Sequence, residues 1–128
     1  MLILDTHAFV WLASDPGKLS SSAVARIEES REPLAISVVT AWEIALLNKR
    51  KRLQLPLPAT EYIDRAIAHH RIRELPLTRK TVLQAVGLPE IHRDPFDRIL
   101  IAEAQLLDAQ LISKDEAISQ YPGIEVVW

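Results

Sequence analysis

The chain has 128 residues, of which 48% are hydrophobic, and its formal net charge is −2. This length and composition predict one globular domain over residues 1–128 and argue against disorder or a second large core. The absence of cysteine excludes disulfides, zinc–thiolate sites and cysteine nucleophiles. Because no apolar run reaches about 18 residues and the N-terminus lacks signal-peptide features, we expect a cytoplasmic protein with no membrane span.

Short apolar or branched stretches alternate along the chain with segments of helical periodicity. The expected strands cover residues 2–4, 34–39, 72–75, 110–113 and 124–127. The expected helices cover residues 6–13, 20–31, 40–50, 60–70, 78–86, 95–109 and 116–120. Strands and helices that alternate in this way predict an α/β sandwich with a parallel sheet.

Four acidic residues lie where an expected strand ends or where the next helix begins. They are Asp5, Glu43, Asp97 and Asp115. Each also has an ordinary structural explanation. Asp5 and Asp115 can cap the helices that follow them, and Glu43 can complete a Thr-x-x-Glu capping box that starts at Thr40. In the first turn of a helix, Asp97 can interact favourably with the helix dipole.

The sequence Asp94-Pro95-Phe96-Asp97 marks the start of a helix. Asp94 suits the N-cap and Pro95 suits the first helical position, which leaves Asp97 free to point outward. Because the carboxyl ends of parallel strands meet at one edge of a sheet, we expect the four acids to converge there. Converging carboxylates repel one another unless a cation neutralises them. Carboxylate oxygens are ligands that Mg²⁺ and Mn²⁺ prefer, so the pattern predicts a divalent-metal enzyme.

Four stretches of the sequence, in this order and spacing, carry a family resemblance. They are Leu4-Asp5-Thr6-His7 with Trp11, residues 37–44 around Trp42-Glu43, residues 92–98 leading into Ile101-Ala102, and Ile112-Ser113-Lys114-Asp115. Over nearly its whole length the chain resembles the PIN-domain ribonucleases, in particular the VapC-like toxins of type II toxin–antitoxin systems. The resemblance implies a PIN-like three-layer α/β/α sandwich with a mainly parallel central sheet of four to five strands. It also implies a Mg²⁺- or Mn²⁺-dependent endoribonuclease that hydrolyses single-stranded RNA and leaves a 5′-phosphate and a 3′-hydroxyl.

The resemblance assigns catalytic and metal-binding roles to the four acids, namely Asp5, Glu43, Asp97 and Asp115. Thr6 and Ser113 match hydroxyl positions that support the acids, although Ser113 stands where a threonine is more usual. Glu116 adds a further negative charge beside this group, and the resemblance assigns it no role. His7 is interpreted as a packed or surface residue and His92 as part of a loop, because the chain has no zinc-ligand spacing.

An RNA substrate would require positive charge beside these acids, because carboxylates repel phosphates. The candidates are Lys49 and Arg50, in the densest basic run of the chain, together with Arg98 and Lys114. The basic run has an alternative explanation as the solvated end of a helix, where cations are favoured. Arg98 directly follows Asp97 and can instead neutralise the acidic group.

The resemblance implies three partners: an RNA substrate, a cognate antitoxin and a second copy of the chain in a homodimer. Two other functions fit the same sequence. One is a non-catalytic PIN-fold interaction module that has lost its metal. The other is a small metal-dependent phosphohydrolase that acts on nucleotides or phosphoproteins. The complete set of four acids argues against the first alternative. Only the family resemblance favours RNA over the substrates of the second.

Overall fold

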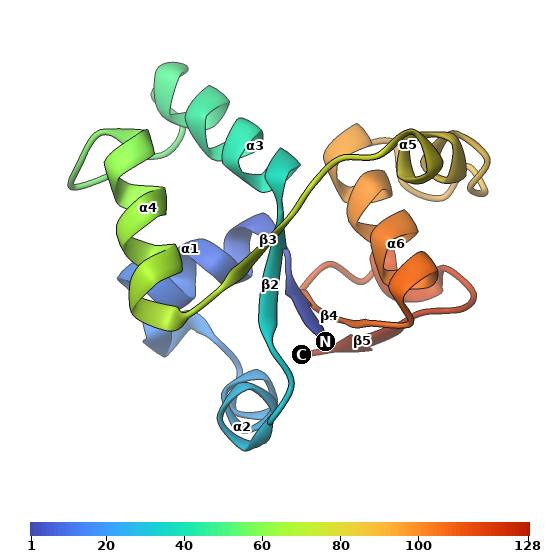
Figure 1. Ribbon diagram of the computed structural model, residues 1–128, viewed down its shortest axis with the longest axis horizontal. Helices are drawn as coiled ribbons and strands as arrows, with labels where there is room; N and C mark the ends of the chain where they lie inside the picture. The colour runs from blue at the N-terminus through green and yellow to red at the C-terminus, as the bar shows by residue number, and fades with distance from the viewer.

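A five-stranded parallel sheet forms the centre of the computed structural model, which describes residues 1–128 (Figure 1). The strands are β1 (Leu2–Leu4), β2 (Leu34–Ser37), β3 (Arg73–Leu75), β4 (Gln110–Ile112) and β5 (Glu125–Val127). They lie in the order β3-β2-β1-β4-β5, and every neighbouring pair is parallel. The predicted α/β fold, with a parallel sheet of four to five strands, is confirmed.

Helices cover both faces of this sheet and give the molecule three layers (Figure 1). The α-helices are α1 (Thr6–Ser14), α2 (Ser21–Glu29), α3 (Val38–Lys49), α4 (Ala59–His70), α5 (Arg79–Val86) and α6 (Pro95–Leu107). α1, α2 and α4 pack on one face of the sheet. α6 packs on the other face, and α5 packs against α6. The helix expected at residues 116–120 is a single 3₁₀ turn, Ile118–Gln120, and a second one covers Pro16–Lys18. No helix has the length and apolar character needed to cross a membrane.

The apolar core is divided in two by the sheet, because successive residues of a strand point to opposite faces. Ile3 packs in the cluster that contains Leu100 of α6, whereas Leu4 packs in the cluster that contains Phe9 of α1. All four side chains are fully buried. Burying a side chain of this size contributes roughly 1.5–3 kcal/mol to the stability of the fold. Because the apolar residues of β1 alternate between the two faces of the sheet, this strand stabilises the packing of both helical layers.

The strand order changes direction at β1, with β2 and β3 on one side and β4 and β5 on the other. In open parallel sheets, ligands bind in the crevice outside the carboxyl ends of the strands at such a point. Leu4 pairs with Ile112 at the ends of β1 and β4, and the next N–H, of Asp5, donates to the Ile112 carbonyl at 3.1 Å. The residues that follow these two strands therefore emerge side by side.

The start of α3 differs from the prediction. Val38 and Val39, which were expected in a strand, form the first turn of the helix, and its N-cap is Ser37. The Ser37 hydroxyl accepts a hydrogen bond from the backbone N–H of Val39 at 3.2 Å. A helix that begins before Thr40 removes the basis for the Thr40–Glu43 capping box, so that alternative role for Glu43 is wrong. Glu43 lies in the second turn of α3 instead.

Candidate functional site

A hollow of about 420 Å³ opens beside the carboxyl ends of β1 and β4. Its walls are mostly polar and acidic, and the lining residues are Asp5, Thr6, His7, Trp11, Glu43, Asp94, Asp97, Lys114 and Asp115. The structure therefore brings together the four acids that were singled out in the sequence, and Asp94 joins them. Glu116 is exposed and does not line the hollow. A larger hollow of about 490 Å³, lined partly by Tyr62 and His69, contains none of these acids.

Asp5 lies at the floor of this hollow and is 6% exposed. One carboxylate oxygen accepts the N–H of Ala8 at 2.7 Å and caps α1, as its position in the sequence predicted. The other oxygen accepts the hydroxyl of Ser113 at 2.5 Å. Burial raises the pKa of Asp5, and these two hydrogen bonds act in the opposite direction. Asp5 thus combines a capping role with a fixed orientation in the hollow.

Glu43 approaches the same hollow from the side of α3. The Thr6 hydroxyl donates a hydrogen bond to its Oε1 at 2.5 Å. Burial raises the pKa of Glu43, and the nearby charges of Asp94 and Asp5 raise it further. Thr6 and Ser113, the two hydroxyl residues singled out in the sequence, therefore each contact one of the acids. Each hydroxyl fixes the rotamer of its partner without adding negative charge.

Asp97 belongs to the first turn of α6, and Asp94 is the N-cap of that helix, as the sequence predicted. The Asp94 carboxylate accepts the backbone N–H groups of Phe96 at 2.8 Å and Asp97 at 3.2 Å. Burial, followed by the neighbouring charge of Asp94, raises the pKa of Asp97 to about 7. The charges of Glu43 and Asp5 act in the same direction. The acids are thus close enough to disfavour one another's ionisation.

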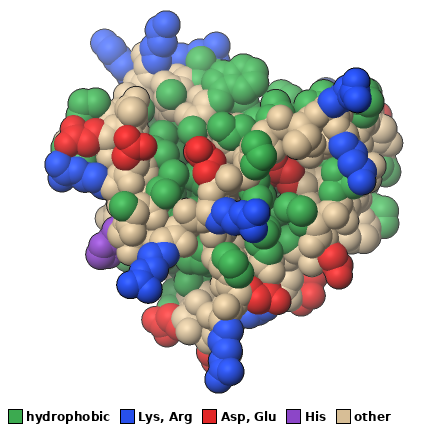
Figure 2. Space-filling model, viewed as in Figure 1, with side chains coloured by type: hydrophobic (Ala, Val, Ile, Leu, Met, Phe, Trp, Pro, Cys, Tyr) green, Lys and Arg blue, Asp and Glu red, His purple; other side chains and the backbone are tan.

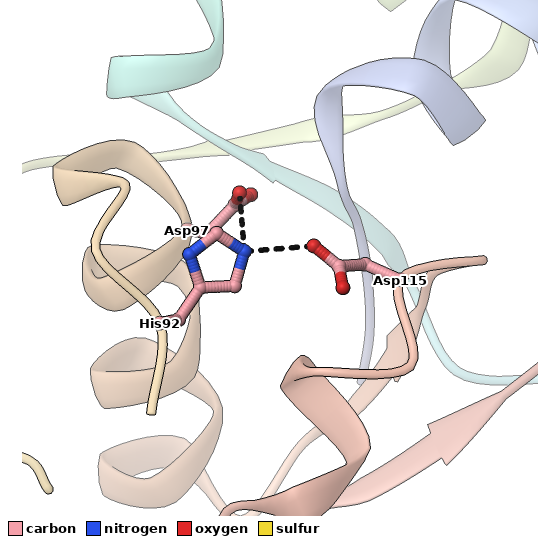
Figure 3. A group of neighbouring side chains, drawn as sticks. All are labelled: His92, Asp97 and Asp115. Atoms are coloured by element: carbon pink, nitrogen blue, oxygen red, sulfur yellow. Dashed lines mark hydrogen bonds and ion pairs between the residues drawn. The ribbon is translucent and has the colours of Figure 1, made fainter. Parts of the chain in front are cut away.

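Asp115 and Asp97 are bridged by His92, a residue that the sequence analysis did not assign to the site (Figure 3). The His92 Nε2 atom lies 2.7 Å from Asp115 Oδ2 and 3.2 Å from Asp97 Oδ2. The interpretation of His92 as loop structure alone is therefore wrong. The sequence signal was its position two residues before an N-cap acid, where the turn directs the ring toward the helix start. The other Asp115 oxygen accepts the N–H of Ala117 at 2.9 Å. The expected helix-capping role of Asp115 is wrong, because the 3₁₀ turn that follows has Ala117 as its N-cap and no side-chain cap.

The basic residues proposed to contact RNA fall in different places. Lys114 lines the hollow. Lys49 and Arg50 are exposed at the end of α3, where Figure 2 shows Lys and Arg side chains gathered, and they do not line the hollow. The terminal nitrogens of Arg98 donate to the backbone carbonyls of Ala85, at the end of α5, at 2.8 Å and of His92, in the loop that follows, at 3.1 Å. RNA contact by these residues stays a prediction, and the contacts of Arg98 give it a structural role.

The donor set of the hollow fits a hard divalent cation. Carboxylate oxygens predominate, and such oxygens are the usual ligands of hard divalent ions. The pKa values of Asp5, Glu43 and Asp97 are all raised, chiefly by burial, and at least one neighbouring carboxylate raises each of them further. A cation in the hollow would remove that repulsion and restore the charged form of each acid.

Comparisons with known proteins agree with this geometry. Residues 2–124 match the model of the PIN domain family. The chain is 30% identical over 130 aligned positions to Ribonuclease VapC22 of Mycobacterium tuberculosis, with 99% of this chain and 98% of that protein covered.

Solved structures with a similar fold include toxin–antitoxin complexes. VapBC2 from Rickettsia felis, bound to a promoter DNA fragment, matches with a TM-score of 0.71 and 12% identity over 98% of this chain and 96% of that chain. A toxin–antitoxin complex from Klebsiella pneumoniae matches with a TM-score of 0.66 and 20% identity over 97% and 95%. At sequence identities this low, the structural similarity establishes that the fold is shared and nothing further.

Proposed function

The chain belongs to the PIN domain family, and on this basis we propose that it is a Mg²⁺- or Mn²⁺-dependent endoribonuclease that hydrolyses single-stranded RNA. One observation carries the proposal. Carboxylates from separate elements of the fold converge in one hollow, and three of them have a raised pKa. The 30% identity to a ribonuclease over nearly the whole chain supports RNA as the substrate.

In this proposal the ion is held by Asp5, Glu43, Asp97 and Asp115. When bound, it would polarise a phosphoryl oxygen and lower the pKa of a water molecule. The chain itself supplies orientation. Ser113 and Thr6 each donate a 2.5 Å hydrogen bond to an acid, so the carboxylates of Asp5 and Glu43 are held in place before the ion arrives. Burial of Asp5 excludes bulk water and strengthens every electrostatic interaction at that point.

Positive charge at the rim completes the proposed mechanism. Lys114 lines the hollow beside the acids and can attract a phosphate that the carboxylates alone would repel. Lys49 and Arg50, exposed at the end of α3 and outside the hollow, would offer further positive charge to a strand long enough to reach them. Water would add to phosphorus as the bond to the 3′-oxygen breaks, and the products would carry a 5′-phosphate and a 3′-hydroxyl.

Cleavage of a labelled single-stranded RNA by metal-free protein, before and after addition of Mg²⁺ or Mn²⁺, tests the proposal. We expect cleavage only with added ion, and we expect Asp5→Asn and Asp97→Asn each to abolish it. Asp64→Asn is the matched control, since Asp64 is exposed on α4 and outside the hollow. Equal cleavage by all four proteins would show that the acids of the hollow are not needed for cleavage and would refute the proposal.

Two further measurements, metal-binding calorimetry and phosphate release, distinguish the two alternative functions. A non-catalytic interaction module would bind neither Mg²⁺ nor Mn²⁺ in calorimetry and would cleave nothing. A small phosphohydrolase would release phosphate from nucleotides or a phosphoprotein faster than it cuts RNA. Neither alternative is favoured by a feature of the hollow.

We further propose that this ribonuclease is the toxin of a toxin–antitoxin pair, acting in the cytoplasm as a homodimer of single-domain chains spanning residues 1–128. The descriptions of the similar solved structures support an antitoxin partner. Induced expression should arrest bacterial growth, and Asp5→Asn should not. Co-expression of the antitoxin encoded beside the gene should restore growth and yield a stable complex. Growth arrest by Asp5→Asn at equal expression would contradict a toxic activity based on this site.

A further inference from the structure

The backbone of His92 is fixed at both of its polar atoms. Its N–H donates to the Tyr121 hydroxyl at 2.6 Å, and its carbonyl accepts from Arg98 at 3.1 Å. The same Tyr121 hydroxyl donates to the Pro89 carbonyl at 2.9 Å, and Arg98 also holds the carbonyl of Leu88 at 3.0 Å. The loop between α5 and α6 is therefore fastened to α6 and to the segment before β5. These hydrogen bonds fix the position of the His92 backbone.

The ring of His92 is fixed at both nitrogens as well. Nδ1 accepts the backbone N–H of Asp94 at 3.1 Å. A ring nitrogen that accepts a hydrogen bond carries no hydrogen, so the ring hydrogen lies on Nε2. Nε2 points between Asp115 and Asp97, at 2.7 and 3.2 Å from the nearer carboxylate oxygens (Figure 3). The ring thus presents an N–H donor to the two acids and no lone pair.

We propose that His92 is a positioning residue of the metal centre, whose Nε2–H holds the carboxylates of Asp97 and Asp115 together without itself binding the ion. Asp97 is attached to α6 and Asp115 to the segment after β4, so nothing covalent fixes their separation. As neighbouring anions they repel, and a donor shared between them opposes that repulsion. This inference rests on the proposed function and adds to it a residue outside the acidic set.

A direct ligand role for His92 conflicts with the same geometry. To offer the Nε2 lone pair to an ion, the ring hydrogen would have to move to Nδ1. It would then face the N–H of Asp94 at the 3.1 Å contact, and two donors would oppose each other. The hydrogen bond from Asp94 therefore selects the donor form of the ring, as expected for a group that orients the metal ligands.

The inference predicts a specific pattern of Mn²⁺ affinities in calorimetry with metal-free protein. Loss of a residue that orients metal ligands typically lowers metal affinity about 10–100-fold. We expect His92→Ala to lower the Mn²⁺ affinity by about the same factor. His92→Gln, which keeps an N–H donor near the position of Nε2, should recover part of this loss. His69→Ala is the matched control, since its ring packs against His70 on α4, with centroids 4.7 Å apart, and lies outside the acidic hollow.

A second measurement needs neither metal nor activity. Long-range ¹H–¹⁵N spectra of the metal-free protein report which nitrogen of each ring carries the hydrogen. We expect Nε2–H for His92, and we expect the same form with bound Mg²⁺, which is diamagnetic. The chain has four histidines, so His92→Ala assigns the signals by the loss of one ring.

Several results would overturn the inference. A hydrogen on Nδ1 would make His92 a ligand, and unchanged or tighter Mn²⁺ binding by His92→Ala would show that it does not position the acids. Loss of RNA cleavage at unchanged Mn²⁺ affinity would place His92 on the substrate instead. If the unaltered protein bound no Mn²⁺, the proposed function would fail and this inference with it. Binding by the unaltered protein that His92→Ala leaves intact would remove this inference alone.

Discussion

Replacing Asp97 by asparagine should stabilise the metal-free fold even though it should destroy the proposed metal site. The pKa of Asp97 is raised from 3.8 to about 7, and its side chain is 20% exposed. An acid with a raised pKa ionises at lower pH in the unfolded chain than in the folded one. Its charge therefore costs folding free energy as the pH rises from about 4 to about 7. At 1.36 kcal/mol per pH unit this cost has an upper limit of about 4 kcal/mol, and we expect Asp97→Asn to recover about 2 kcal/mol or more.

Urea denaturation in EDTA at about pH 8 and about pH 4 measures this effect. The free energy of unfolding of Asp97→Asn should exceed that of the unaltered protein at the higher pH, and the difference should vanish at the lower pH. Mn²⁺ at about 1,000 times its Kd should reverse the order, because it would stabilise the unaltered protein by about 4.1 kcal/mol and the variant would bind it poorly. Lower stability of the variant in EDTA at the higher pH would refute the claim that Asp97 is electrostatically strained.

Three further predictions follow from the same electrostatics. Burial raises the pKa of Glu103 to about 7. Glu103→Gln should therefore raise the free energy of unfolding by up to about 3 kcal/mol at about pH 8 and by little at about pH 4.5, measured by urea denaturation. Ser113→Ala removes the 2.5 Å hydrogen bond to Asp5, so Mn²⁺ affinity should fall about 10–100-fold in calorimetry. Because Asp97 with its raised pKa must release a proton to the solvent, Mn²⁺ affinity should weaken as the pH falls below about 7. A flat pH profile between about pH 8 and about pH 6 would contradict this last expectation.

The convergence of the acids could be predicted from the sequence, because it depends on features that a sequence carries. Apolar runs mark the strands, and an acid that follows such a run lies at the carboxyl end of the sheet. Asp5 follows β1 directly, and Asp97 follows a Pro-containing helix start whose N-cap is Asp94. These signals are local in the sequence, and the parallel sheet brings the acids that they mark together in one hollow.

Other features depend on contacts between distant residues. Val38 and Val39 are β-branched and favour a strand, yet they begin α3 because the side chain of the preceding Ser37 caps the helix. The contact of His92 with Asp115 joins residues that are 23 positions apart. The position of His92 two residues before Asp94 orients its ring locally, but its contact with Asp115 also depends on the loop geometry that Arg98 imposes. The position of Arg98 beside Asp97 in the sequence suggested charge neutralisation, whereas its side chain holds the loop.

Anomalous diffraction from crystals of the protein soaked in Mn²⁺ would locate a metal ion held by the converging acids. We expect a manganese peak inside the hollow, within coordination distance of Asp5 and Asp97, and its loss in crystals of Asp5→Asn. A hollow without manganese at saturating Mn²⁺, or a peak elsewhere on the surface that Asp5→Asn leaves unchanged, would contradict this expectation.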